Sequence, residues 1–260
     1  MSRHDLASAR PTGGRHSRRQ ELTNLLAAAR VAVAVRRRTA AGGGRDGGRD
    51  GGRDGAVRPD LDLAERPPDS AFARAAFEAS RDADSSAGSA VLAHCLRTWL
   101  WADVLGRANG LRPDPELLYA ACLLHDLGLT PAHRGRRGGC FAVEGGLAAL
   151  DLATAHGYPR AEALADAVVL HREVTVPRDR GVEAHLLNAG AGADLLRART
   201  HGAGGGVRRA IEERYPADGL EAGILGPLRE QAALRPRSRV GVLERRLGFT
   251  DRVHAARAPR

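Results

Sequence analysis

The sequence predicts an all-α fold, and its composition and residue pattern carry this prediction. Aromatic residues make up only 3% of the chain and hydrophobic residues 43%, so the core must consist mainly of Ala, Leu and Val. Such a core suits packed helices better than a sheet rich in β-branched and aromatic residues. No segment alternates between apolar and polar residues for long enough to require a strand. The length of 260 residues allows one good-sized core.

Helical patterns begin near residue 69 and continue to about residue 250. We expect helices over residues 71–81, 87–109, 115–127, 142–156, 160–173, 182–197, 207–214, 220–234 and 240–247. Asp114 followed by Pro115 predicts an N-cap and a first helical position. Gly110 and Gly157 stand where left-handed C-caps belong. The punctuation between the expected helices therefore agrees with an all-helical domain.

The first 68 residues are predicted to be a disordered basic arm and linker. Residues 43–54 read GGRD three times, a low-complexity stretch with nothing to bury. A basic amphipathic helix over residues 18–38 that docks on an anionic surface is the alternative for the upstream part. We therefore divide the chain into an arm over 1–68, one helical domain over 69–250 and a disordered tail over 251–260.

The net charge of +9 is concentrated in this arm. Residues 1–58 contain thirteen arginines against five acidic residues, so the rest of the chain is nearly neutral. Nucleic acid is therefore not an expected partner of the folded part, because the basic footprint would have to lie on the domain itself. Weak contact of the arm with polyanions stays open.

Cysteine usage and hydropathy favour a cytoplasmic protein. Cys95, Cys122 and Cys140 form no C-x-x-C pair and are odd in number, which predicts neither a disulfide framework nor a thiolate zinc site. The apolar run over residues 25–35 is broken by Arg30 and is too short to span a bilayer. No membrane partner is expected, and no particular oligomeric state is predicted.

The segment LLYAACLLHDLGL, residues 117–129, carries the strongest chemical signal. Its apolar helical stripe delivers His125 and Asp126 into the interior. A buried carboxylate without a partner costs several kcal/mol, and a metal ion is one way of satisfying it. The dipeptide alone is weak support, since His4-Asp5 in the arm is a chance copy.

Two further candidate ligands lie on other expected helices. His94 lies in VLAHCLRTWLWA and Asp194 in AGAGADLL, both in apolar helical sequence. Two imidazoles and two carboxylates suit Zn, Fe, Mn, Ni or Mg, so the spacing does not choose the metal.

With these residues the chain resembles the HD-domain metal hydrolases. Their ordered signature of a first His, a His-Asp pair and a late Asp is met by His94, His125-Asp126 and Asp194. Over roughly residues 70–250, the chain is also similar to the branch of this superfamily that includes the cyanamide hydratases. The segments that carry this similarity are HCLRTWLWA, LLHDLGL, FAVEGGLAA with HGYP, AVVLH and GAGADLL. The resemblance implies a single helical bundle, one divalent metal ion per chain and a metal-activated water.

Three more residues are catalytic candidates, each with a structural alternative. Arg97 lies three residues after His94 and either anchors a substrate phosphate or forms a salt bridge inside the fold. His171 ends an apolar helix and is a further ligand, a general acid or a satisfied core histidine. Glu144 either orients a water or favours the positive end of a helix, and the helix-end role is preferred.

Three functions remain in competition, and the first two use this one site. The first is hydrolysis of a small phosphoester by the metal-activated water. The second is hydration of a small nitrile-like carbon, as the similarity to cyanamide hydratases implies, favoured by a compact pocket closed by Trp99, Trp101 or Phe141. The third is a catalytically silent binding or regulatory module. Leu129 stands where several HD nucleotidases have a Glu general base, so a nucleotidase mechanism of that kind is not expected.

Overall fold

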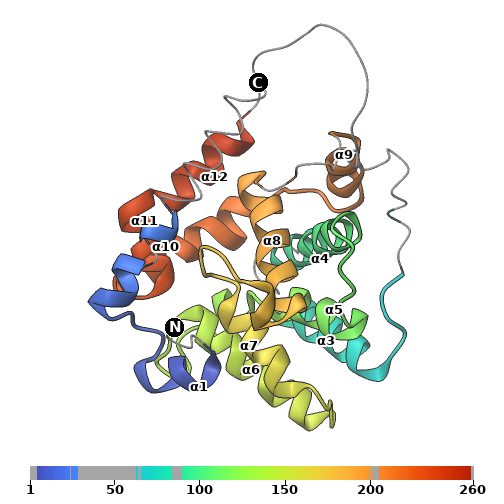
Figure 1. The fold of residues 1–260 in the computed structure, drawn as a ribbon, viewed down its shortest axis with the longest axis horizontal. Helices are drawn as coiled ribbons and strands as arrows, with labels where there is room; N and C mark the ends of the chain where they lie inside the picture. The colour runs from blue at the N-terminus through green and yellow to red at the C-terminus, as the bar shows by residue number, and fades with distance from the viewer. Residues whose placement is uncertain are drawn as a thin grey trace, which may run out of the picture.

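The computed structural model describes residues 5–23, 25–28, 63, 66–83, 90–198, 200 and 205–258. Over these residues the chain is helical and contains no β-strand, which confirms the predicted fold class (Figure 1). The helices are α1 (Leu6–Ala9), α3 (Ala71–Ala83), α4 (Ala90–Ala108), α5 (Pro115–Leu124), α6 (Phe141–Ala155), α7 (Ala161–Leu170), α8 (Val182–Leu196), α9 (Gly205–Arg214), α10 (Gly226–Leu234), α11 (Arg239–Leu247) and α12 (Phe249–Arg257). Shorter helical turns are η1 (Arg10–Thr12), η2 (Leu127–Leu129), η3 (Arg178–Arg180) and η4 (Glu221–Leu225).

Helices α4, α5 and α8 form the centre of the domain (Figure 1). Every residue of α5 from Leu117 to Leu124 is buried, and α4 is buried along most of its length. Helix α8 packs along α4, while α6 packs against α7. A helix that is apolar on all sides belongs in a core, so these sequences predict central positions as well as helical structure.

The predicted start of α5 and the left-handed glycines after α4 and α6 are confirmed. The Asp114 carboxylate accepts hydrogen bonds from the backbone N–H groups of Glu116 and Leu117 at 3.0 and 3.1 Å. Pro115 follows at the first helical position. Gly110 and Gly157 have φ angles of 63° and 62°, the left-handed region that glycine tolerates best.

The C-terminal region differs from the sequence expectation in two places. The helix predicted over 220–234 contains the π-helical turn η4 before α10, and Pro227 at the start of α10 has no N–H to donate to the preceding turn. The predicted disordered tail from residue 251 is instead part of α12. This helix is held because Phe249 and Val253 are buried in the core.

The beginning of the chain also departs from the predicted disordered arm. Leu6 and Ala9 of α1 are buried against α6 and α7, and the Leu6 N–H donates to Asp166 at 2.8 Å. The His16 N–H donates to the Arg237 carbonyl at 2.8 Å. These partners are remote in sequence, so local composition did not reveal the packing. The GGRD repeat of residues 43–54 lies outside the described residues, as does most of the helix proposed over 18–38; residues 18–23 and 25–28 are helical.

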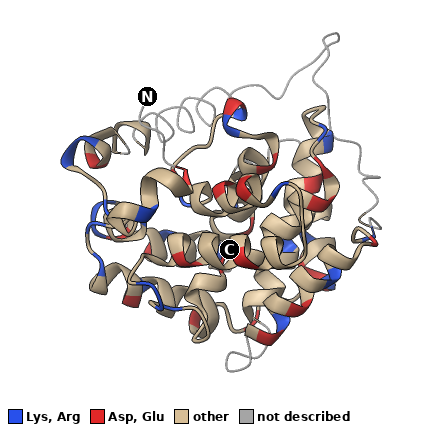
Figure 2. Ribbon diagram, turned by 90° about the horizontal axis from the view of Figure 1, so that it is seen from below, with Lys and Arg blue, Asp and Glu red and all other residues tan. Residues whose placement is uncertain are grey.

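Charge is dispersed over the domain. Figure 2 shows acidic and basic positions interspersed along the described helices. Within the described part of the chain, no helix has both the length and the apolar character needed to cross a bilayer.

Candidate metal centre

Two close backbone approaches bring the candidate residues together. A Cβ atom on Gly190 of α8 would lie 2.4 Å from the Thr98 carbonyl oxygen of α4, so only glycine permits this approach of the two helices. A Cβ atom on Gly128 would lie 1.9 Å from the Phe141 carbonyl oxygen. The first contact places Asp194 beside His94, and the second holds the turn after α5 against the start of α6.

The helices that carry the site end earlier than predicted. Helix α5 stops at Leu124 and α7 at Leu170, so His125, Asp126 and His171 lie in the turns that follow. The backbone of Asp126 has φ −104° and ψ 9°, outside the helical range. This change of direction turns its carboxylate toward the two imidazoles next to it.

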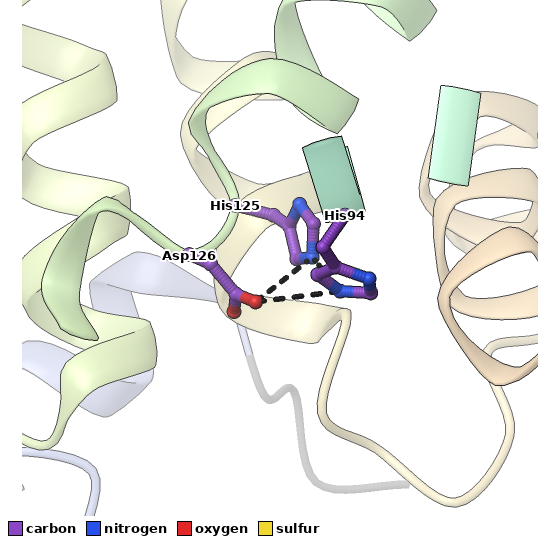
Figure 3. Close-up of side chains that lie close together, drawn as sticks. All are labelled: His94, His125 and Asp126. Carbon is purple, nitrogen blue, oxygen red and sulfur yellow. Dashed lines mark hydrogen bonds and ion pairs between the residues drawn. The ribbon is translucent and has the colours of Figure 1, made fainter. Parts of the chain in front are cut away.

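His94, His125 and Asp126 converge on one point in the interior (Figure 3). The two Nε2 atoms lie 3.3 Å apart, and each lies 3.4 Å from Oδ2 of Asp126. All three residues are at most 4% exposed. Three potential ligand atoms from α4 and from the turn after α5 therefore face one another in a space shielded from water.

Hydrogen bonds fix the tautomer of each histidine. Nδ1 of His125 lies 2.8 Å from the Cys122 carbonyl oxygen, which can only accept, so Nδ1 carries the proton. Nδ1 of His94 lies 2.7 Å from Oδ2 of Asp194 and donates to that carboxylate. In the neutral form, each Nε2 then offers a lone pair to the shared point. This is how metal-binding histidines are usually oriented by the groups behind them.

His171 adds a third imidazole on the other side of Asp126. Its Nδ1 lies 2.5 Å from the Val168 carbonyl oxygen and donates to it. Its Nε2 is buried, lies 3.5 Å from Oδ1 of Asp126 and has no hydrogen-bond partner among the described residues. The satisfied core histidine that the sequence left open is therefore not what the structure shows.

Burial favours the neutral forms of His125 and His171, while Asp126 remains ionised. Burial lowers the pKa of His125 to about 3 and also lowers the pKa of His171. Burial acts to raise the pKa of Asp126, but the neighbouring histidines outweigh it and the pKa lies well below its usual range. The site thus presents imidazole lone pairs and a carboxylate at neutral pH, the form in which these groups bind metal ions.

Asp194 lies behind His94, where it is held by Arg97. Nε and Nη2 of Arg97 donate to the two oxygens of Asp194 at 2.8 and 2.9 Å, and Nη1 donates to the Pro216 carbonyl at 2.8 Å. Arg97 is only 1% exposed. The phosphate-anchoring role considered for Arg97 does not fit these contacts, whereas the salt bridge inside the fold does. Asp194 as a fourth metal ligand stays a prediction.

Glu144 takes the helix-end role preferred from the sequence. It lies in the first turn of α6, where its carboxylate accepts from the backbone N–H groups of Arg137 and Gly139 at 3.0 and 2.7 Å. These bonds fix the glycine- and arginine-rich loop before α6. A cavity of about 600 Å³ lies beside this loop, and His133, Arg136, Arg137 and Glu144 line part of it.

Arg172 is a buried charged residue that the sequence analysis did not consider. It follows His171 directly, is 8% exposed, and its guanidinium carbon lies 4.4 Å from the Phe249 ring centroid and 6.0 Å from that of Phe141. Adjacency to His171 was the only signal in the sequence. The other ring that contacts its guanidinium, that of Phe249, lies far along the chain, and no local sequence pattern links it to the site.

Comparison with known proteins agrees with this geometry. Residues 91–199 match the family model described as HD domain, a range that contains His94, His125, Asp126, His171 and Asp194. No curated protein matches the sequence. Over residues 91–199, this chain is therefore similar to the HD domain.

Proposed function

We propose that this protein is a metal-dependent hydrolase of small phosphoesters. The observation that carries the proposal is the set of acceptor atoms around Asp126, where Nε2 of His94, His125 and His171 all lie within 3.5 Å of a carboxylate oxygen. Their Nδ1 protons are committed elsewhere, so no donor in this set satisfies the carboxylate. Burying acceptors together without a donor is costly, and a cation removes that cost.

The ligand set fits a divalent ion. His94, His125 and Asp126 would hold it, with Asp194 as a proposed further ligand, and imidazole with carboxylate suits Zn, Fe, Mn or Ni better than it suits Ca. Such an ion lowers the pKa of water and polarises an electrophile near neutral pH. The HD domain is consistent with this chemistry, while the substrate class is our proposal.

His171 is placed to move a proton. Its Nε2 faces the site with no partner, while Nδ1 is anchored to the backbone. Because burial lowers its pKa, Nε2 starts unprotonated; it would take a proton from the attacking water and then give that proton to the leaving oxygen. We therefore assign His171 the role of proton donor to the leaving group in preference to that of a further ligand.

Hydration of a small nitrile-like carbon is the second candidate. It is favoured by the enclosure of the site, since Asp126 is 4% exposed and the Phe141 ring lies 5.6 Å from the His171 ring. Of the aromatic residues considered as a closing wall, Phe141 is the one in contact with a site histidine, whereas Trp99 packs against Tyr119. The similarity to cyanamide hydratases remains an expectation. A silent binding module is disfavoured because an empty acceptor cluster would only destabilise the fold.

The test is elemental analysis of the purified protein together with a substrate panel. We expect about one divalent metal ion per chain and chelator-sensitive turnover of a generic phosphomonoester, with little turnover of cyanamide. Asp126→Ala should lose the metal. Asp103→Ala, which removes a surface carboxylate paired with Arg107, should keep it. Metal-free protein without turnover after reconstitution would refute the proposal, and turnover of cyanamide alone would favour the second candidate.

A further inference from the structure

The guanidinium of Arg172 is buried without a paired carboxylate. Its Nε and Nη2 atoms are inaccessible to solvent and donate to no hydrogen-bond acceptor among the described residues. No carboxylate oxygen of the described chain lies within ion-pair distance of it. A buried charge in this state is strongly destabilising, so its retention calls for a partner that the described part of the chain does not supply.

The other buried arginines of the described region show what a structural arginine looks like. Arg97 uses Nε and Nη2 as a fork that grips both oxygens of Asp194. Arg239 pairs with Glu173 at 2.7 Å and donates to the Val169 carbonyl at 2.5 Å. Arg172 has the same Nε and Nη2 edge unused. This edge matches two oxygens of a carboxylate or a phosphate.

The surroundings of Arg172 place its guanidinium next to the residues of the candidate metal centre. His171, its neighbour in the chain, faces Asp126. The Phe141 ring contacts the His171 ring, and its centroid lies 6.0 Å from the guanidinium carbon of Arg172. On the other side the guanidinium lies 4.4 Å from the Phe249 ring centroid, a cation–π contact that holds its plane without using its N–H groups.

The nearest acidic groups do not neutralise Arg172. Asp126 and Glu244 act on it electrostatically from a distance. Glu244 is committed elsewhere, since its two oxygens accept from the backbone N–H and the hydroxyl of Thr250 at 3.0 and 2.6 Å. Asp126 faces the histidines. The Nε and Nη2 edge of Arg172 is therefore left without a partner among the described residues.

We propose that Arg172 binds an oxyanion of the substrate through its Nε and Nη2 edge, with a phosphate group as the fitting ligand. The proposal rests on the proposed function and deepens it, because it gives the substrate a negative charge beside the metal site. It also separates the two candidate functions, since a neutral nitrile would leave this guanidinium unpaired.

The experiment compares Arg172→Met with Arg239→Met and with Arg107→Met, a surface control paired with Asp103. Thermal unfolding is recorded with and without inorganic phosphate, phosphate affinity is measured by calorimetry, and metal content by elemental analysis. Phosphate should raise the Tm of the wild type and of Arg107→Met but leave Arg172→Met unchanged, and the affinity of Arg172→Met should fall about tenfold or more. Without phosphate, Arg172→Met should unfold at the wild-type temperature or above it, because an unpaired buried charge is removed.

Two outcomes would overturn the proposal that Arg172 anchors a substrate oxyanion. One is an undiminished phosphate response in Arg172→Met; the other is a loss of Tm like that expected of Arg239→Met, whose paired charge is structural. Arg172→Lys, which keeps the charge but not the fork, should recover only part of the affinity. If the wild type holds no metal and turns nothing over, yet its phosphate response depends on Arg172, the proposed function fails and the anchor stands. A metal-loaded, active wild type whose phosphate binding ignores Arg172 gives the reverse result.

Discussion

The two sides of the metal centre differ in how completely their polar groups are satisfied. On the side of α4 and α8, His94, Asp194 and Arg97 form a closed network with contacts of 2.7 to 2.9 Å. On the side of α7, His171 and Arg172 carry buried nitrogen atoms without partners. The fold thus satisfies the polar groups on one side of the centre and leaves hydrogen-bonding groups without partners on the other side. We expect reactants to bind on that second side.

The largest effect should come from His171, on the unsatisfied side. His171→Asn keeps a donor near the Nδ1 position for the Val168 carbonyl but removes Nε2. We expect turnover to fall by about a hundredfold to ten-thousandfold, as for loss of a general acid. Stability should change by less than about 1 kcal/mol, because Nε2 makes no bond in the fold. Steady-state kinetics and urea unfolding check this, and turnover within tenfold of wild type would contradict it.

The satisfied side should respond in stability instead. Asp194→Asn leaves the buried Arg97 without its carboxylate, and we expect a loss of about 3–5 kcal/mol in the free energy of unfolding. The double variant Asp194→Asn with Arg97→Met should recover part of this loss, because it removes the unpaired charge. Urea unfolding of the two variants measures both terms. A loss below about 1 kcal/mol in the single variant would mean that this network is not structural.

The smallest effect should appear at the helix contact that supports the satisfied side. Gly190→Ala introduces a Cβ atom 2.4 Å from a backbone oxygen, so α4 and α8 must separate, at a cost of about 1–3 kcal/mol. Gly192→Ala is the matched control on the same helix, since its Cβ would meet nothing within 4 Å. The control should gain up to about 1 kcal/mol from helix propensity. Equal destabilisation of both variants would show that the contact is not tight.

The sequence predicts the fold and the candidate metal ligands better than it predicts the roles of the charged residues beside those ligands. Local signals such as Asp114-Pro115 and the apolar stripe before His125 were enough to place helices, because caps and periodicity act over a few residues. The roles of Arg97 and Arg172 depend on which remote groups reach them. Arg97 pairs with Asp194, whereas the described partners of the Arg172 guanidinium are aromatic rings, and no spacing along the chain distinguishes the two arginines.

The same reason explains the ends of the chain. Residues 5–16 belong to the arm predicted to be disordered because the GGRD linker separates it from the domain, yet α1 is held by Asp166 and by apolar side chains of α6 and α7. Helix α12 was missed because only two large apolar side chains, Phe249 and Val253, anchor it, too few to form a recognisable helical pattern. Packing onto a preformed core stabilises such short segments, which have little helical preference of their own.

Arg239 has a consequence for how this site can diversify. It donates to the Val169 carbonyl, pairs with Glu173 and contacts His16, and so braces the His171 turn from outside residues 91–199. Phe249, from the same outer part of the chain, flanks Arg172. The residues proposed to hold the ion thus lie within residues 91–199, whereas two of the contacts that position His171 and Arg172 come from the outer part of the chain. A substitution outside residues 91–199 can therefore change how a reactant is selected while the proposed metal ligands stay the same.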